Sequence, residues 1–343
     1  MASARHFQNL PLFPEEDVPV AKIDTISLAD LRSLDDTAGQ KLFASCKELG
    51  FFMLDLTEDE VGKTMVDVID RLFDISRCLM DLSEEEKMRY FHDIPKSFLG
   101  FKPRGVARTE HNQPDRFEWF NIGCDGLTGT GPLQPLPPIM KNNLALLKAF
   151  RDFGQDIITL IFDALASRLG ISTESFTTLN SPDQVSGTII RFIKSFASPT
   201  EEDMSTSMIH HTDVGTITLL ANTLGGLQIL KPGGDPMDPK AWQWLQPRPG
   251  CLIVNLGDAM VQWTSGALRS NVHRINHAPG SQRFVDRYSL GLFIRPNRDA
   301  PMNPLTGDGD KTQLTAWEWE VRKLMGFQRE ERNGVDKGGE SAL

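Results

Sequence analysis

Hydrophobic residues in the first half of the chain recur with the period of an α-helix. Thr57-Glu58-Asp59-Glu60 has the spacing of a capping box, in which a hydroxyl and a carboxylate satisfy free N–H groups where a helix begins. The apolar residues that follow lie at helical spacing: Val61, Met65, Val68, Leu72 and Phe73. Ser83-Glu84-Glu85-Glu86 repeats the start signal before a short helix. The pattern predicts a mostly helical region over residues 1–185.

The longest predicted helix opens at Pro137 and Pro138, because proline is favoured in a first helical turn. Its apolar side is formed by Leu144, Leu147, Phe150, Phe153 or Gly154, Ile157, Ile161 and Leu165. Gly170 is the predicted C-terminal stop. Residues 92–135 have no such period and are rich in Gly, Pro and charge. Five aromatic residues there need burial, which predicts an ordered excursion with some strand: Phe98, Phe101, Phe117, Trp119 and Phe120.

After Gly187 the pattern changes to short apolar or β-branched runs that are separated by Gly, Pro and Asp. These runs are Thr188 to Phe196, Thr216 to Ala221, Leu227 to Leu230, Cys251 to Leu256, Asn271 to Ile275 and Tyr288 to Ile294. Short strands at such intervals are typical of an all-β barrel or jelly roll. We therefore expect a jelly-roll core over residues 186–300. A last helix over residues 312–332 is expected to be capped by Thr315, and all 343 residues are expected to form one catalytic unit.

Composition excludes some partners. The 343 residues are 40% hydrophobic and 24% charged, as in ordinary globular proteins. The formal net charge of −10 argues against a nucleic-acid or anionic-membrane partner. No apolar run is long enough to span a bilayer, and the first residues lack the apolar core of a signal peptide. The four cysteines contain no CxxC pair, which favours reduced thiols in a cytoplasmic protein.

The first candidate chemistry is His211-Thr212-Asp213, with His273 further along the chain. Side chains two apart on an extended segment share one side, so His211 and Asp213 can meet one ion. His273 lies in a strand-like run that a barrel could bring close. Two histidines and one carboxylate leave one side of a metal open, which suits non-haem Fe(II). The pair alone is a weak motif, and for His273 taken alone a structural or surface histidine is the favoured interpretation.

Other ionisable groups near these residues are interpreted as structural. His210 precedes His211 and must face the opposite side of the strand. His277 lies close to a turn at Pro279-Gly280. Asp258 follows Gly257, a setting that predicts a tight turn in which the aspartate caps its own backbone.

A second candidate site is an anion clamp at Arg287-Tyr288-Ser289. Arg287 and Ser289 share one face of the last strand, and Tyr288 takes the other. A guanidinium offers a two-pronged fork that matches a carboxylate, and the hydroxyl adds a further donor. The alternative is an edge-strand arginine whose charged head lies in water.

Together these residues resemble a known family, the isopenicillin N synthase-like Fe(II)/2-oxoglutarate-dependent dioxygenases. The resemblance extends from about Val18 to Phe327 and is most specific between His211 and Arg274. This block contains, in order, His211-Thr212-Asp213, Gly225-Gly226-Leu227-Gln228-Ile229, Trp244, Asn255-Leu256-Gly257-Asp258, Gln262-Trp263-Thr264-Ser265-Gly266 and His273-Arg274.

The resemblance implies a double-stranded β-helix with flanking helices. It implies Fe(II) held by His211, Asp213 and His273, and Arg287 and Ser289 on the distal carboxylate of 2-oxoglutarate. The implied reaction uses O₂ to hydroxylate, desaturate or cyclise a small organic substrate, such as a fungal secondary metabolite, with release of succinate and CO₂.

Two features depart from the family pattern. His273 and Arg287 are further apart than is usual, which predicts a longer hairpin over Ala278 to Asp286. Phe196 stands where the family often has a tyrosine that contacts the cosubstrate, and Arg191 or Lys194 is the candidate to compensate.

The substrate pocket is expected to be lined by the excursion, including Lys102 and Arg104, which favours a partly apolar substrate with a carboxylate or phenolate. Phe192, Met208 and Phe293 are further pocket candidates, although each could instead belong to the core.

Three other functions stay open. One is an oxidase of the isopenicillin N synthase type that needs no 2-oxoglutarate, for which Gln328 would be a late ligand. The others are a binding protein that has lost its chemistry and a zinc hydrolase, which would have no need of the clamp.

Overall fold

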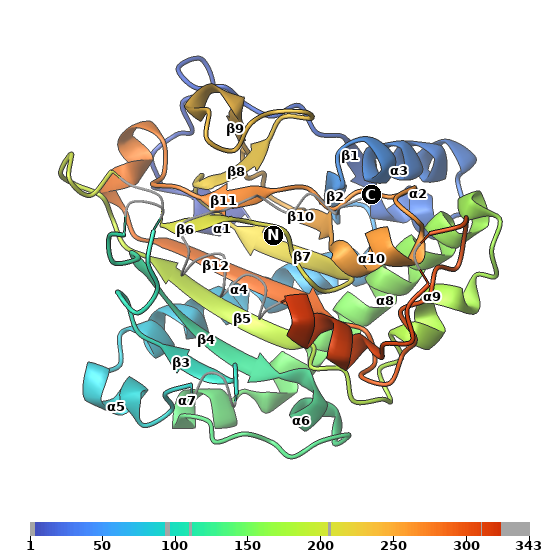
Figure 1. Ribbon diagram of the computed structural model, residues 1–343. Helices are drawn as coiled ribbons and strands as arrows, with labels where there is room; N and C mark the ends of the chain where they lie inside the picture. The colour runs from blue at the N-terminus through green and yellow to red at the C-terminus, as the bar shows by residue number, and fades with distance from the viewer. Residues whose placement is uncertain (1–3, 93–96, 110–111, 205–206, 310, 324–343) are drawn as a thin grey trace.

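Two β-sheets face each other in the computed structural model, which describes residues 4–92, 97–109, 112–204, 207–309 and 311–323. The larger sheet has eight strands and the smaller has four (Figure 1). In spatial order the large sheet contains β1 (Thr25–Ser27), β2 (Phe51–Asp55), β10 (Cys251–Leu256), β7 (Ile217–Asn222), β12 (Arg287–Ile294), β5 (Ile189–Ser195), β4 (Phe117–Gly123) and β3 (Gly100–Lys102). The small sheet contains β6 (Met208–His211), β11 (His273–Ile275), β8 (Leu227–Leu230) and β9 (Trp242–Trp244).

From β5 onwards the chain winds between the two sheets. Strands β5, β7, β10 and β12 belong to the large sheet, whereas β6, β8, β9 and β11 belong to the small one. All pairs among them are antiparallel. This alternation is the winding of a jelly roll and confirms the predicted fold class.

Helices cover the outer face of the large sheet (Figure 1). The two longest are α4 (Glu60–Met80) and α8 (Leu144–Leu169), and both pack in one core with the sheet. The other described helices are α1 (Ala4–Phe7), α2 (Leu28–Arg32), α3 (Asp36–Glu48), α5 (Glu84–Met88), α6 (Cys124–Thr128), α7 (Pro138–Lys141), α9 (Glu174–Leu179), α10 (Asp258–Trp263), the 3₁₀ turns η1 (Pro239–Ala241) and η2 (Gly280–Phe284), and residues 316–323. None of the described helices is both long and apolar enough to cross a membrane.

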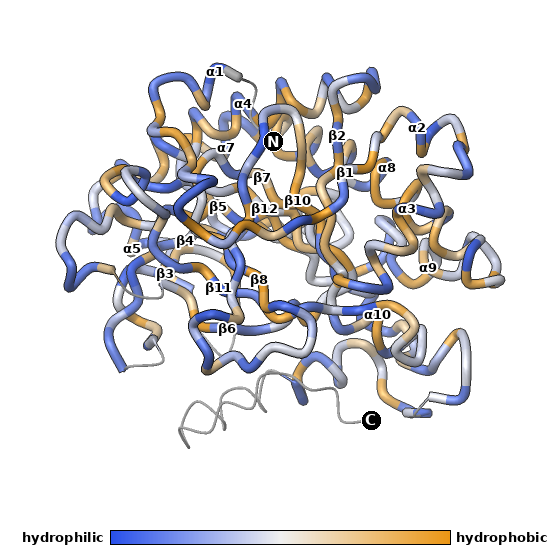
Figure 2. The backbone as a smooth tube through the Cα atoms, turned by 90° about the horizontal axis from the view of Figure 1, so that it is seen from above, coloured by the Kyte–Doolittle hydropathy of each residue, from blue (hydrophilic) through white to orange (hydrophobic). Residues whose placement is uncertain are grey.

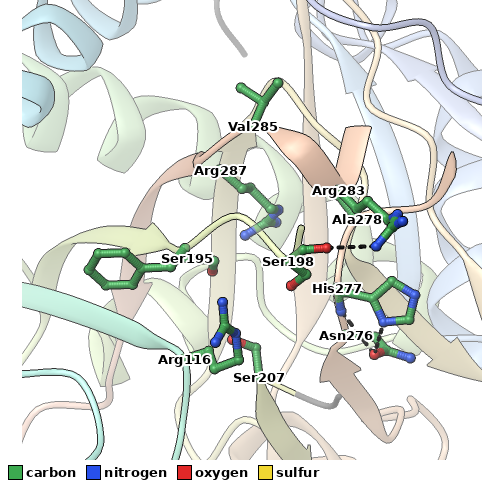
Figure 3. A pocket seen from close by; sticks show the side chains of 11 residues that line it. Arg116, Ser195, Ser198, Ser207, Asn276, His277, Ala278, Arg283, Val285 and Arg287 are labelled. Carbon is green, nitrogen blue, oxygen red and sulfur yellow. Dashed lines mark hydrogen bonds between the residues drawn. The ribbon is translucent and has the colours of Figure 1, made fainter. Parts of the chain in front are cut away.

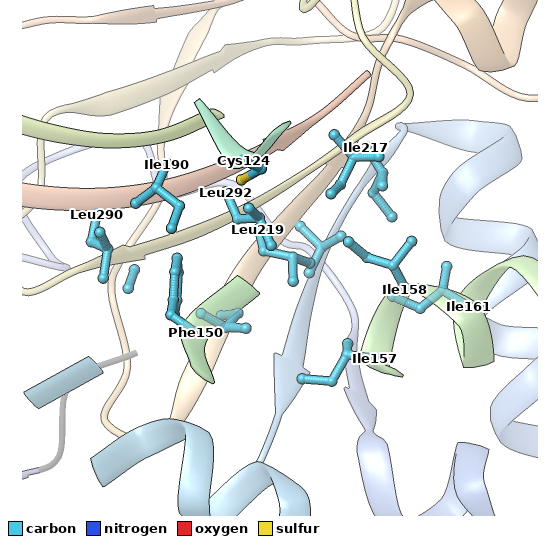
Figure 4. Packing of buried hydrophobic residues seen from close by; sticks show 14 of the residues in the cluster. Cys124, Phe150, Ile157, Ile158, Ile161, Ile190, Ile217, Leu219, Leu290 and Leu292 are labelled. Atoms are coloured by element: carbon cyan, nitrogen blue, oxygen red, sulfur yellow. The ribbon is translucent and has the colours of Figure 1, made fainter. Parts of the chain in front are cut away.

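The main hydrophobic core lies between α8 and the large sheet (Figure 4). Phe150, Ile157 and Ile161 of α8 meet Leu219 of β7 and Leu292 of β12, and all five side chains are buried. Viewed from above, the hydrophobic segments gather in the interior strands and hydrophilic segments lie in the outer loops (Figure 2). Burial of these helix and sheet faces supplies the main favourable term in folding.

Several predicted boundaries were wrong in detail. Helix α4 is capped by Asp59 and not by Thr57, because the Asp59 carboxylate accepts the Gly62 N–H at 2.8 Å and Thr57 instead binds Asp55. The prolines open only the short α7, and α8 begins after Asn143. Residues 278–286 form no hairpin: they cross from the small sheet to the large sheet through η2.

Other start and stop signals were confirmed. The Ser83 hydroxyl accepts the Glu86 N–H at 3.2 Å, and Gly170 ends α8 with a positive φ of 69°. Thr315 and Glu318 cap each other reciprocally where the last described helix begins, and its predicted extension to residue 332 lies outside the described residues. The described part of residues 1–185 also supplies β1–β4 to the large sheet, and the division of the chain into regions stays a prediction.

Gly154→Ala is expected to destabilise the protein, although Ala usually stabilises a helix interior relative to Gly by about 0.5–1 kcal/mol. An added Cβ would lie 2.3 Å from Leu292 Cδ2, and Leu292 is fully buried. Overpacking of this kind costs about 1–3 kcal/mol. Denaturant unfolding followed by circular dichroism measures the change. Gln155→Ala is the control and should stay within about 0.5 kcal/mol of the wild type; a stabilised Gly154→Ala protein would contradict the packing described.

Candidate functional site

The two candidate histidines are direct neighbours across a strand pair. Strands β6 and β11 are antiparallel, with His211 opposite His273, and the two ring centroids lie 4.4 Å apart. Asp213 follows β6 by two residues. One donor atom from each of the three side chains lies within 4.8 Å of the others. The fold therefore brings together the three residues that the sequence singled out, which we call the triad.

Backbone carbonyls orient both imidazole rings. His211 Nδ1 lies 2.9 Å from the Ile209 carbonyl, and His273 Nδ1 lies 3.1 Å from the Asn271 carbonyl. A ring that donates from Nδ1 has its Nε2 lone pair free for a metal. Burial, followed by the charge of His273, lowers the pKa of His211 to about 4. The neutral ring that metal binding requires is therefore the form present at neutral pH.

The Asp213 carboxylate is held by the opposite sheet. Its Oδ2 accepts hydrogen bonds from Thr218 Oγ1 of β7 and Asn255 Nδ2 of β10, each at 2.7 Å. Its Oδ1 lies 3.9 Å from His211 Nε2 and 3.8 Å from His273 Nε2. Burial alone raises the pKa of Asp213, but the two histidines and the two hydrogen bonds outweigh it and hold the pKa below its usual value. Three donors thus converge on one place with their charges and orientations set, which fits a divalent metal.

Asp258 supports this loop and does not cap its own backbone as predicted. It is the first residue of α10, and its N–H donates to the Asp213 carbonyl at 2.7 Å. Its carboxylate accepts the Thr212 hydroxyl at 3.1 Å and the Lys323 ammonium. His210 faces away from the triad as expected and packs against Trp242 with a centroid distance of 6.1 Å.

Arg287 and Ser289 lie on the inner face of β12 and are only 3% and 1% exposed. Arg287 Nε donates to the Leu224 carbonyl at 3.3 Å. Within the described chain, five buried side-chain atoms around this place have no hydrogen-bond partner: the possible donors Arg287 Nη2, Arg116 Nε, Ser289 Oγ and Ser195 Oγ, and the acceptor Asn222 Oδ1. Buried donors are rarely left unsatisfied, so this cluster fits an anion such as a carboxylate. Burial lowers the pKa of Arg287 to about 10, which keeps it charged at neutral pH.

A pocket opens beside Arg287 (Figure 3), and in that view Arg287 and Arg116 both point into it. Its wall includes Ser207 and Asn276, which adjoin the strands that carry the two histidines. Phe196 also lines the pocket, with the Arg104 guanidinium 4.8 Å and the Lys194 ammonium 5.1 Å from its ring centroid. Ser195 was missed by the sequence analysis, although it shares the strand face of Arg191 by period two.

The predicted substrate residues divide into two groups. Lys102 is buried, and its ammonium is already paired with Asp115 and bonded to the Phe117 carbonyl, so it is not a free substrate cation. Phe192 is fully buried in the core on the helix side of the sheet. Arg104 is exposed beside Phe196, and Met208 is half-buried on β6. Phe293 packs over the Arg191 guanidinium on the inner face.

Comparison with known protein sequences identifies the family of this chain. A sequence model of the 2OG-Fe(II) oxygenase superfamily matches residues 184–296, and a model of the N-terminal region of non-haem dioxygenases in morphine synthesis matches residues 18–138. A 2-oxoglutarate-dependent dioxygenase of Aspergillus fumigatus is 30% identical over 315 residues, which cover 86% of this chain and 81% of that protein. The chain belongs to the 2OG-Fe(II) oxygenase superfamily. The matched segment contains His211, Asp213, His273, Arg287 and Ser289.

Solved structures of other proteins have the same fold as this chain. A Neurospora crassa protein in complex with α-ketoglutarate and thymine aligns with a TM-score of 0.74 at 21% identity, covering 89% of this chain and 97% of that one. JOX2 in complex with 2-oxoglutarate, Fe and JA aligns with a TM-score of 0.66 at 18% identity, covering 94% and 93%. Family membership confirms the predicted oxidoreductase class and its use of Fe(II) and 2-oxoglutarate, and it favours this class over the isopenicillin N synthase type of oxidase.

Removal of the hydrogen bonds to Asp213 is expected to weaken metal binding. Thr218→Val and Asn255→Ala each remove one of the two hydrogen bonds to Oδ2, so the carboxylate is held less firmly with Oδ1 towards the histidines. Changes to such supporting residues typically cost about 10–100-fold in metal affinity. Titration with Mn(II) followed by electron paramagnetic resonance measures the dissociation constant. Asn143→Ala removes an amide hydrogen bond to Ile139 away from the triad and serves as the control; equal dissociation constants in all variants would contradict the assigned role.

Proposed function

We propose that His211, Asp213 and His273 hold Fe(II), and that Arg287 and Ser289 bind the distal carboxylate of 2-oxoglutarate. The observation that carries the proposal is the set of buried donors on β12 and β5 that lack partners in the described chain, close to the strands of the triad. Buried donors are rarely left without a partner, so we infer that a ligand completes Arg287 Nη2 and the two hydroxyls. A dicarboxylate supplies the acceptor oxygens that these donors need.

His211, Asp213 and His273 would hold Fe(II), which when bound would supply the chemistry that couples oxidative decarboxylation of 2-oxoglutarate by O₂ to cleavage of a substrate C–H bond, with succinate and CO₂ as co-products. The protein's own contribution is orientation. Thr218 and Asn255 fix the carboxylate ligand, and the two backbone carbonyls fix the rings. Phe51 packs edge-on against His273, with a centroid distance of 5.5 Å, and keeps one side of the centre apolar.

The similarity to fungal 2-oxoglutarate-dependent dioxygenases supports a small organic substrate, such as a secondary metabolite. Hydroxylation is the default outcome that we propose, with desaturation or ring closure as variants of the same C–H cleavage. The acidic net charge of −10 supports a protein without nucleic-acid or membrane partners. The cysteines form no disulfide within the described residues, and three of the four are buried, which supports a reducing, cytoplasmic location.

The decisive experiment is anaerobic loading with Fe(II) and 2-oxoglutarate, followed by exposure to O₂ and measurement of succinate. Wild-type protein should release succinate without added substrate at a slow, iron-dependent rate. His211→Ala and Asp213→Ala should abolish it. Arg287→Gln should weaken 2-oxoglutarate binding by about 10–100-fold, because a charge-assisted hydrogen bond contributes about 1.5–3 kcal/mol. Ser289→Ala should have a smaller effect of a few fold.

Calorimetric titration with 2-oxoglutarate, together with the metal titration described above, separates the roles of these residues. The Arg287 variant should keep its metal affinity, whereas the Asp213 variant should lose it. Iron-dependent O₂ consumption without succinate would instead identify an oxidase of the isopenicillin N synthase type. Failure of both iron and 2-oxoglutarate to bind would refute the proposed function.

A further inference from the structure

A second arginine lies on the inner face of the large sheet. Arg191 of β5 stands opposite Asn121 of β4 and Gly291 of β12. Its Nε donates to Asn121 Oδ1 at 2.8 Å. Its guanidinium carbon lies 4.1 Å from the Trp119 ring centroid and 4.8 Å from that of Phe293. Since β4 and β12 flank β5 on opposite sides, the two rings approach the guanidinium from opposite sides.

Gly291 makes this arrangement possible. A Cβ at this position would lie 2.5 Å from Cε2 of Phe293, so any larger residue would displace the ring that covers the guanidinium. The cation is thus held by one hydrogen bond and two aromatic faces, which fixes its plane. Because Nε is used by Asn121, the two Nη groups form the edge that is left for a ligand.

Arg191 has no acidic partner in the described chain. No ion pair joins it to a described carboxylate, whereas two cations near it, Lys102 and Arg295, are paired with Asp115 and Glu320. Burial lowers the pKa of Arg191 to about 10. Phe293, whose ring lies against the guanidinium, stands opposite Thr218 of β7, and the Thr218 hydroxyl holds Asp213; this register places Arg191 on the side of the sheet that faces the triad.

Arg191 is not positioned to share the ligand of Arg287. Arg287 stands opposite Ser195, and Ser195 lies four residues from Arg191 on β5. Four strand residues span about 13 Å. The two heads are also held apart, because Arg287 Nε binds the Leu224 carbonyl beyond β7 whereas Arg191 Nε binds Asn121 on β4. The two guanidiniums are therefore anchored to different strands, which favours a separate anion for each.

We propose that Arg191, held between Trp119 and Phe293, binds a carboxylate of the substrate that is oxidised, through its two Nη groups. The inference rests on the proposed function, since it places the substrate across the triad from 2-oxoglutarate. The aromatic rings at its flanks select a substrate with an apolar or aromatic body next to its acid group. The substrate class is therefore an aryl or otherwise apolar carboxylic acid, and Arg191 takes over the role that the sequence assigned to Lys102.

The test compares acids with their neutral analogues. Full-length protein is loaded with Fe(II) and 2-oxoglutarate under argon and titrated by calorimetry with phenylacetate, 3-phenylpropionate and trans-cinnamate, each alongside its methyl ester. The wild type should bind at least one acid about 10–100-fold more tightly than its ester. Arg191→Gln should remove this preference, and Arg191→Lys should keep part of it because the charge remains.

Two controls test whether the loss of acid preference is specific to the Arg191 site. Arg298→Gln removes an exposed arginine that stacks over Trp317, 4.5 Å from the ring centroid, and should keep the full acid preference. Affinity for 2-oxoglutarate should be unchanged in Arg191→Gln and reduced in Arg287→Gln. The inference is overturned if acids bind no better than esters to the wild type, if Arg191→Gln keeps the preference, or if it weakens 2-oxoglutarate as much as Arg287→Gln does.

A failure of the proposed function would give a different set of results from a failure of the Arg191 inference. Probe binding is measured directly, with and without 2-oxoglutarate and iron. A protein that binds acids through Arg191 but neither binds 2-oxoglutarate nor releases succinate would refute the dioxygenase assignment and leave the Arg191 site standing.

Discussion

The Asp213 carboxylate connects the two sheets of the jelly roll at the site. Its main chain continues from β6 in the small sheet, and its Oδ2 is bound by Thr218 and Asn255 in the large sheet. The pairing of β6 with β11 sets His211 opposite His273, and the two hydrogen bonds from the other sheet bring the carboxylate to them. Any change in the distance between the sheets would separate the three donors. The metal site is therefore a consequence of how the sheets face each other.

The same large sheet serves two purposes on its two faces. Its outer face carries Leu219, Phe192 and Leu292, which pack against the helices. Its inner face carries Arg191, Ser195, Arg287 and Ser289, which face the site and are polar. Strand period two separates these roles residue by residue. The helices stabilise the outer face strongly enough for the inner face to keep unsatisfied donors, whose burial costs free energy until a ligand binds.

Period two also explains what the sequence could and could not predict. It places His211 and Asp213 on one face, and Arg287 and Ser289 on another common face. The order of the strands within the matched segment then brings these residues to one site. On β5 the residue type of Phe192 suggests a pocket residue, whereas period two puts Phe192 on the helix side and Arg191 on the inner face. Nothing in the sequence indicates that Lys102 is paired with Asp115, which lies 13 residues away just before β4, because such a pairing leaves no local signal. The crossing at residues 278–286 was likewise hidden, because parity alone does not distinguish a hairpin from a change of sheet.

The two arginines on the inner face, Arg287 and Arg191, lie at different positions along the strands. Arg287 lies at the start of β12, and Arg191 stands opposite Gly291 further along the same strand. Asp213 is the carboxylate whose charge acts on Arg191, but its oxygens already face the two histidines and accept the hydrogen bonds of Thr218 and Asn255. Neither guanidinium has an acidic partner among the described residues, and a backbone spacing of about 13 Å along the strand favours two separate anions. A cosubstrate held at one end and an acidic substrate held at the other would both present their reactive carbons towards the three ligands between them.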